Sequence, residues 1–382
     1  MIISPTKVPV FLLLTFILLV NVLSVWHLSA TYDEGRHLQY GRNLLNLDPR
    51  RSEPFYDSKM PFSALNAVPS LIGQRLSKWM GVKSGFCSFL QGWFAARFIT
   101  ILFSMLLAFY VYRWSRELYG PYAGLLSLFL YAFSPNIIAH SQLVTTDLYL
   151  ACMTTLAVYY FWKFMRTPNR KTAVLSAGTL GLAQLAKYTA VFLYPIFLIL
   201  TLLSHLPDRS SCCWTKDPWR LFRGVGTGLK YAVFFALTSL LLINAGFVGY
   251  RTFTPLKEYE FQSRLFQGIQ ATRLGDWPVP VPAPYLQGLD MVRNHDQTGD
   301  TFGGLYLRGE LCTRTDGQIQ GFPGYFFYAL LFKEPVALQI LLVLAGLYYM
   351  INRKKFAFFN NELFLLIPVI FFLVYFNFFF NT

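Results

Sequence analysis

Two adjacent carboxylates, Asp33 and Glu34, are the first residues in this sequence whose types and spacing could do chemistry. They follow the first apolar segment almost directly, in the run Thr31-Tyr32-Asp33-Glu34-Gly35. Such a pair can supply a general base together with an orienting group, or can bind a divalent cation. On composition alone, a solvated acidic pair at a helix start is the favoured interpretation, because carboxylates suit the helix dipole there.

Three basic residues could complement these acids. Arg97 lies about five residues inside an apolar segment, where a cation is costly unless it snorkels to the interface or finds an anion such as Asp33 or a phosphate. Both outcomes are open from the sequence. Lys59 stands beside a proline-fixed turn and Lys187 at a tight turn between two apolar segments. Lysines so placed suit a lipid phosphate, although a surface lysine is favoured for Lys59 in isolation and an interfacial anchor is an alternative for Lys187.

A further acid, Asp147, opens a later apolar segment directly after Thr145 and Thr146. A helix N-terminal acid needs no chemical role. Asp147 is nevertheless expected on the same side of the membrane as Asp33, so the two carboxylates can converge. The nearby His140 is better explained as a hydrogen-bonded structural residue. The five cysteines show no metal-ligand spacing, and neither a dinucleotide fingerprint nor a P-loop is present in the sequence.

The elements that must position these residues are membrane spans. Of 382 residues, 54% are hydrophobic and 14% charged, against roughly 25% charged residues in ordinary soluble domains. Nine apolar segments approach or exceed the length that crosses a bilayer. They are 8–28, 92–112, 121–134, 147–165, 173–186, 188–204, 231–249, 335–351 and 363–380. The sequence therefore predicts an all-α integral membrane protein with about nine spans in a single domain, 1–382.

The distribution of charge orients these spans. With the N-terminus inside, the inner segments carry fifteen basic and four acidic residues, whereas two long polar segments, 31–91 and 250–334, carry sixteen and fourteen. The positive excess is mostly cytoplasmic, as the positive-inside rule requires. Topology thus explains the net charge of +14 without a nucleic-acid partner. The two polar segments become outer loops, where chemistry is expected. A retained first span is favoured over a cleaved signal peptide, because its apolar run is too long.

Taken together, these residues resemble the protein O-mannosyltransferase-like family of phospholipid-carrier-dependent glycosyltransferases, which have the GT-C fold. The resemblance is ordered and spans approximately 31–335. It rests first on the acidic pair, on the turn at Lys59 and on Arg97. It continues through Ser134-Pro135, Asp147, the run from Gly181 to Lys187, the run from Pro282 to Gly288, Asn294, Gly299, Gly309-Glu310, Tyr325-Phe326 and Lys333-Glu334-Pro335.

This resemblance implies a polytopic GT-C-type helix bundle with amphipathic helices in the outer loops. It implies a sugar donor linked to polyprenyl phosphate and a lipid, glycan or protein acceptor. The implied catalytic residues are Asp33 as general base, Glu34, which helps to hold the site, and Asp147. The implied substrate-binding residues are Lys59, Arg97, Lys187 and Asn294. A divalent cation at Asp33 and Glu34 is compatible with the family, but no dedicated metal cage is evident. The expected location is a bacterial inner membrane with the site facing the periplasm.

Two departures from the family pattern bear on these expectations. The turn reads Lys59-Met60-Pro61, whereas many relatives, including those that put aminoarabinose on lipid A, have a lysine followed by two prolines. The chain also ends straight after an apolar segment where relatives continue, so a C-terminally truncated chain or a short variant is expected. Two other classes of function stay open. A transporter would bury charges mid-membrane and show paired repeats, which are not seen, and a non-catalytic scaffold would tolerate replacement of Asp33, Lys59 and Arg97.

Overall fold

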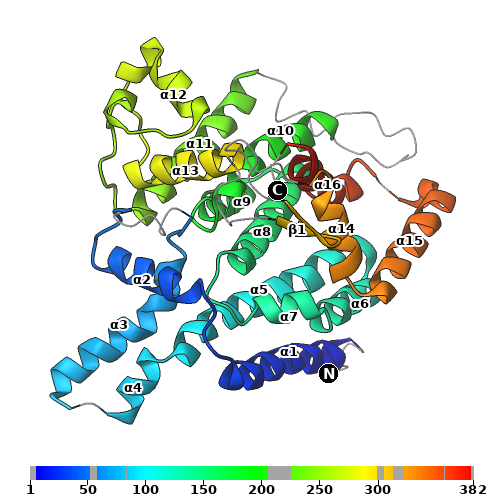
Figure 1. Cartoon of the computed structure of the whole chain (residues 1–382). Helices are drawn as coiled ribbons and strands as arrows, with labels where there is room; N and C mark the ends of the chain where they lie inside the picture. Colours follow the sequence, from blue (N-terminus) through cyan, green and yellow to red (C-terminus); the bar gives the residue numbers. More distant parts are fainter. Residues whose placement is uncertain are drawn as a thin grey trace. The chain divides into compact units, whose positions relative to one another are not determined.

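The computed structural model describes residues 6–51, 58–82, 84–204, 225–298, 305–312, 322–356 and 358–379. These residues form sixteen α-helices and one two-stranded antiparallel hairpin (Figure 1). The chain divides into two compact units, which are considered separately. The first comprises Met1–Tyr160, Arg170–Ala190 and Val233–Tyr250, and the second comprises Phe161–Asn169, Val191–Ala232 and Arg251–Thr382.

The first unit contains most of the long helices. They are α1 (Lys7–His27), α2 (Glu34–Leu45), α3 (Ser63–Met80), α4 (Gly85–Gln91), α5 (Trp93–Tyr119), α6 (Pro121–Ala132), α7 (Pro135–His140) and α9 (Arg170–Ala183). Two helices, α8 (Asp147–Arg166) and α11 (Val225–Gly246), contribute residues to both units. The second unit contains α10 (Leu193–Leu203), α12 (Arg264–Gln270), α13 (Ala283–Thr298), β1 (Leu305–Leu307), β2 (Glu310–Cys312), α14 (Tyr325–Lys333), α15 (Val336–Ile351) and α16 (Glu362–Phe378).

Each of the nine apolar segments contains a helix, which confirms the predicted all-α membrane helix bundle. Among the described residues, α1, α5 and residues 228–246 of α11 are long and apolar enough to cross a membrane. The pair α14 and α15 would count as a fourth span, but its two helices are bent by 109°. The other apolar helices are shorter or less hydropathic, so the number of nine spans stays a prediction.

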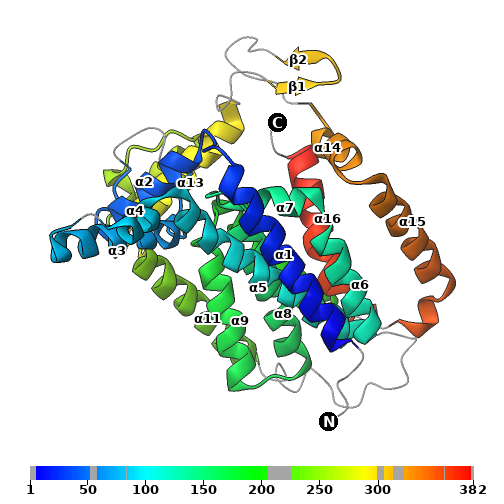
Figure 2. The ribbon, with the colours of Figure 1, turned by 90° about the horizontal axis from the view of Figure 1, so that it is seen from below.

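Helices α5 and α6 of the first unit form a tight helical hairpin. Helix α5 ends at Tyr119 and is followed by Gly120, whose φ of +93° is strained for residues with a side chain. Pro121 then starts α6 at a position where its missing N–H is not needed. A Cβ on Gly124 would lie 2.8 Å from the carbonyl oxygen of Tyr112, so only glycine allows this approach of α6 to α5. Helix α1 packs along both helices, as Figure 2 shows.

Helices α2 and α3 lie side by side in the first polar segment (Figure 1). A Cβ on Gly41 would lie 2.2 Å from the carbonyl oxygen of Ser63, so the two helices meet at a distance that requires glycine. Helix α3 is in turn tied to α5 and α8 by Asn66, whose amide nitrogen donates to Thr100 at 3.0 Å and whose oxygen accepts from Tyr149 at 2.8 Å. This polar network holds α3, and with it the neighbouring α2, against α5 and α8.

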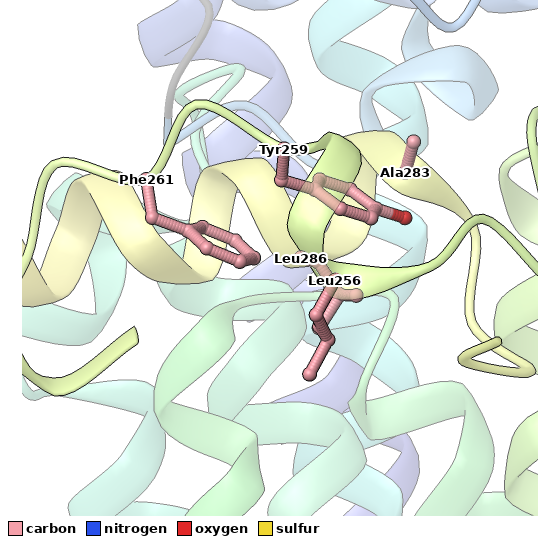
Figure 3. Close-up of a cluster of buried hydrophobic side chains, with 5 residues drawn as sticks. All are labelled: Leu256, Tyr259, Phe261, Ala283 and Leu286. Carbon is pink, nitrogen blue, oxygen red and sulfur yellow. The ribbon is translucent and has the colours of Figure 1, made fainter. Parts of the chain in front are cut away.

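A small apolar core organises the second unit. Leu256, Tyr259 and Phe261 precede α12 and pack on Ala283 and Leu286 of α13 (Figure 3). The rings of Tyr259 and Phe261 are stacked, with centroids 5.1 Å apart. The hairpin of β1 and β2 turns through two positive-φ residues, Arg308 and Gly309, as a two-residue turn that matches the strand twist requires.

Candidate active site

The two adjacent acids, Asp33 and Glu34, have different environments. Asp33 precedes the first residue of α2, and its side chain makes no capping hydrogen bond to that helix. Its carboxylate is 53% exposed, whereas that of Glu34 is fully buried. Successive residues at a helix start point in different directions, about 100° apart around the axis. The start of α2 therefore presents one acid to solvent and the other to the interior of the first unit.

Glu34 forms a buried, two-pronged ion pair with Arg97 of α5. Nε and Nη2 of Arg97 donate to the two carboxylate oxygens at 2.9 and 2.7 Å. The other partners are the hydroxyl of Thr31, which donates to Glu34 at 3.1 Å, and backbone groups. Glu34 accepts from the amides of Thr31 and Val144, both at 2.9 Å, and Arg97 donates to the carbonyl oxygens of Leu28 and Ser29 at 2.8 and 2.7 Å. This network joins the end of α1 to α2, α5 and the segment before α8.

The charge on Glu34 is secured by these contacts. Burial raises the pKa of Glu34, but the hydrogen bonds from Arg97, Thr31 and Val144 outweigh it and hold the pKa below its usual value. Of the two outcomes open for Arg97 from the sequence, the structure shows pairing with a carboxylate, and its partner is Glu34. Because both groups are fully buried and bonded, their geometry favours a positioning role over direct contact with substrate.

Asp33 faces a lysine. Nζ of Lys59 lies 3.4 Å from its carboxylate, a long contact that leaves most of the carboxylate open. The lysine side chain is only 6% exposed. Burial lowers the pKa of Lys59, and the nearby carboxylate of Asp33 offsets this only in part. Lys59 is thus a buried side chain beside one carboxylate, and not the surface lysine that the sequence favoured for it in isolation. Tyr56 and Asp57, which precede it, lie outside the described residues.

A second ion pair lies in the same unit. Asp147 opens α8, and its carboxylate accepts from Nζ of Lys187 at 2.7 Å. Lys187 follows α9 in a tight turn, as predicted, and the side chain of Gln184 closes that turn with a hydrogen bond to the carbonyl oxygen of Ala190 at 3.0 Å. Both charged groups are partly exposed, at 46% and 38%. This site therefore offers a second acid and a second cation to solvent.

His37 connects the two ion pairs, and sequence reasoning missed it. It is buried in α2, with Nδ1 3.1 Å from Oγ of Ser63 at the start of α3. After burial itself, the charges that act most strongly on its imidazole are the four members of the two pairs, Lys59, Asp33, Asp147 and Lys187. The sequence could have indicated this position, because a residue four positions after Asp33 lies on the same face of a helix.

Lowering the pH should destabilise the protein through His37. Burial, together with the charge of Lys59, lowers the pKa of His37 from 6.5 to about 3. Below pH 6.5 the unfolded chain therefore takes up a proton that the folded chain does not, and stability falls by about 1.4 kcal/mol for each pH unit down towards pH 3. Above pH 6.5 this effect is absent. Thermal unfolding in detergent at pH 7.5 and pH 5 measures it.

The matched variants are His37→Gln and His140→Gln. His140 is exposed, so its replacement should leave the pH dependence of the melting temperature as in the wild type. His37→Gln should flatten that dependence between pH 6.5 and pH 5. A His37→Gln protein that loses stability with acid as steeply as the wild type would contradict the assignment.

A divalent cation at Asp33 and Glu34 does not fit this geometry. Both oxygens of Glu34 accept hydrogen bonds from Arg97 and from backbone amides. Only Asp33 has a carboxylate free enough to bind a metal. Within the described ranges, no group of three or more His, Cys, Asp or Glu residues is arranged to hold a metal ion.

Asn294, the remaining predicted site residue, belongs to the second unit. It lies on α13, and its amide nitrogen donates to Gln262 at 3.2 Å in an exposed contact. Gly299, which carries part of the resemblance in the same segment, lies outside the described residues. The role of Asn294 in substrate binding therefore stays a prediction, whereas the other predicted site residues all lie in the first unit.

The fold defines a helical membrane protein with a charged site beside its apolar helices. Residues 83–229 match the model of the dolichyl-phosphate-mannose-protein mannosyltransferase family. A comparison with curated proteins found no match. The matched segment includes Arg97, Asp147 and Lys187, whereas Asp33 and Lys59 precede it. The resemblance predicted from the sequence is confirmed over this segment, and the match supports a glycosyltransferase of the mannosyltransferase kind.

Proposed function

We propose that this protein transfers a sugar from a polyprenyl-phosphate carrier to a hydroxyl or amine acceptor, with Asp33 as the general base. The observation that carries the proposal is the pair of ion pairs Lys59–Asp33 and Lys187–Asp147 in the first unit, whose lysine segments are joined by the hydrogen bond from Phe62 to Leu185. The two carboxylates and two ammonium groups come from four separate segments, and all four charges act on the buried imidazole of His37. Transfer from a lipid phosphate needs both kinds of group, a base for the acceptor and cations for the leaving phosphate.

The proposed reaction is a single displacement at the anomeric carbon. The acceptor oxygen or nitrogen attacks that carbon while Asp33 takes the acceptor's proton. The bond between the anomeric carbon and the phosphate oxygen breaks, and its electron pair leaves with the polyprenyl phosphate. Lys59 and Lys187 stabilise the negative charge that develops on this phosphate. A displacement of this kind inverts the anomeric configuration.

The other predicted residues support this division of roles. Asp147 fixes the ammonium group of Lys187 at 2.7 Å and lies on the acceptor side as the second acid. Glu34 and Arg97 hold the start of α2, so the position of Asp33 depends on them. Since α1 ends at His27, shortly before the acidic pair, a lipid carrier in the bilayer has its phosphate close to the membrane boundary where Asp33 lies. This boundary faces the periplasm of a bacterial inner membrane in our proposal.

The experiment measures the release of polyprenyl phosphate, because this product forms whichever acceptor is used. The protein is reconstituted in proteoliposomes with a membrane extract as the source of lipid, glycan and protein acceptors. Polyprenyl-phosphate mannose, glucose and aminoarabinose are supplied separately, with GDP-mannose as the nucleotide-linked control. We expect release of polyprenyl phosphate from at least one lipid donor and no transfer from GDP-mannose.

Three results would overturn the proposed function. Transfer from GDP-mannose alone would replace the lipid donor by a nucleotide sugar. Uptake of a labelled donor or sugar into the vesicles, without release of polyprenyl phosphate from any lipid donor, would favour the transporter. If neither transfer nor uptake is observed, a non-catalytic scaffold becomes the favoured class of function.

A further inference from the structure

Arg51 joins the two chain segments that carry Lys59 and Lys187. Its Nη2 donates to the carbonyl oxygen of Lys59 at 3.0 Å and to the hydroxyl of Tyr188 at 2.5 Å. Tyr188 directly follows Lys187 in the sequence. One guanidinium group therefore holds the backbone of the first lysine and the side chain next to the second.

The guanidinium group is itself held among aromatic rings. Its Cζ lies 5.3 Å from the ring centre of Tyr40, 5.7 Å from that of Tyr188 and 6.0 Å from that of Phe247. All three aromatic residues are buried, so they have little freedom to move. Arginine suits this position, because its planar, weakly hydrated cation stacks on rings while its N–H groups bond at fixed angles.

The two lysine segments also contact each other directly. The amide of Phe62, three residues after Lys59, donates to the carbonyl oxygen of Leu185 at 3.3 Å. The positive charge of Lys187 is among the influences that lower the pKa of Lys59, so the two ammonium groups repel each other. Each lysine pairs with one carboxylate, Lys59 with Asp33 and Lys187 with Asp147, and neither carboxylate pairs with both lysines. An anion that contacts both lysines would remove this repulsion.

We propose that Arg51 is a positioning residue, which sets the separation of Lys59 and Lys187 so that both can contact one donor phosphate. The inference rests on the proposed function and deepens it. Arg51 acts through the carbonyl oxygen of Lys59 and the hydroxyl of Tyr188. Its replacement should therefore weaken binding of the donor most, and it should slow the chemical step by a smaller factor, because the same two lysines also stabilise the leaving phosphate while the base is retained.

The test compares three single variants in the transfer assay with the lipid donor that the wild-type protein uses. Arg51→Lys keeps the positive charge but cannot bond both partners from one planar group. Tyr188→Phe keeps the aromatic ring and removes only the hydroxyl. Arg50→Lys is the matched control, because the neighbouring Arg50 is 61% exposed and pairs with Asp48 in the same segment.

We expect Arg51→Lys to raise KM for the lipid donor by about tenfold or more, since a charge-assisted hydrogen bond is lost, and to lower kcat by a smaller factor. Tyr188→Phe should raise KM in the same direction by a smaller factor, and Arg50→Lys should behave as the wild type. A wild-type KM in Arg51→Lys, or a loss confined to kcat, would overturn the inference. If Arg51→Lys does not fold by its melting curve, Tyr188→Phe decides in the same way.

A binding measurement separates this inference from the proposed function. Undecaprenyl phosphate, which carries no sugar, is titrated into nanodiscs that contain the wild-type protein or Arg51→Lys. Weaker binding to the variant supports the inference even if the wild-type protein transfers no sugar, in which case only the proposed function fails. Equal binding to both proteins, or binding to neither, overturns the inference.

Discussion

Replacing Asp33 by asparagine should lower kcat for sugar transfer by about 10²- to 10⁴-fold, the range for loss of a general base. Asparagine has nearly the same shape but cannot take the acceptor's proton. The fold should survive, because Asp33 is half-exposed and its contact with Lys59 is long, at 3.4 Å. The asparagine oxygen can still accept from Nζ of Lys59, and this lysine, whose pKa burial already lowers, can lose its proton when the carboxylate is gone. Steady-state release of polyprenyl phosphate gives kcat, and a melting curve in detergent reports the fold.

Asp48→Asn is the control for this experiment. Asp48 is another exposed acid of the same polar segment, and it pairs with Arg50 at 2.7 Å. Its replacement should leave both kcat and the melting temperature near the wild-type values. If Asp33→Asn turns over at the wild-type rate while the wild-type protein is active, Asp33 is not the base, and the second acid, Asp147, becomes the next candidate.

The largest loss of stability is expected for Arg97→Met. Methionine fills much of the same space, but it leaves the carboxylate of Glu34 buried without its cation. Breaking a buried pair in this way typically lowers the free energy of unfolding by about 3–5 kcal/mol. The loss should be visible as a lower melting temperature, or as aggregation on size-exclusion chromatography in detergent. Activity should fall with it, because the start of α2 carries Asp33.

The double variant Arg97→Met/Glu34→Gln shows that the loss comes from the unpaired charge. Glutamine removes the buried charge and keeps an oxygen that can accept from the amide of Val144. We expect the double variant to be more stable than Arg97→Met alone. As an exposed comparison, Arg113→Met breaks the pair with Glu117 on the surface of α5, where the expected change is about 0.5 kcal/mol or less. A single variant as stable as the wild type, or a double variant no better than the single, would contradict this account.

The predictions for Asp33 and for Arg97 give two adjacent acids, Asp33 and Glu34, different roles. Glu34 and Arg97 act on the fold, so their loss should reduce activity and stability together. Asp33 acts on the reaction, so its loss should reduce activity alone. The separation follows from the direction in which each side chain leaves the start of α2, one towards the interior and one towards solvent.

The sequence by itself determined the class of this protein. Long apolar segments report burial in lipid directly, because hydrophobicity accumulates along a continuous stretch of chain. The same local information placed Asp33 and Glu34 next to a membrane boundary and carried the family resemblance. It was not enough to decide the number of spans, since segments such as 121–134 form a helix shorter than a bilayer is thick.

Only the tertiary structure decided which charges meet. Arg97 pairs with Glu34, 63 residues away; Lys59 lies beside Asp33, 26 residues away; and Lys187 pairs with Asp147, 40 residues away. Arg51 drew no attention in the sequence, because its partner Tyr188 lies 137 residues further along the chain. Such pairings depend on close helix contacts like that of Gly41 with Ser63. No local pattern encodes them, because each is a property of two distant segments packed together.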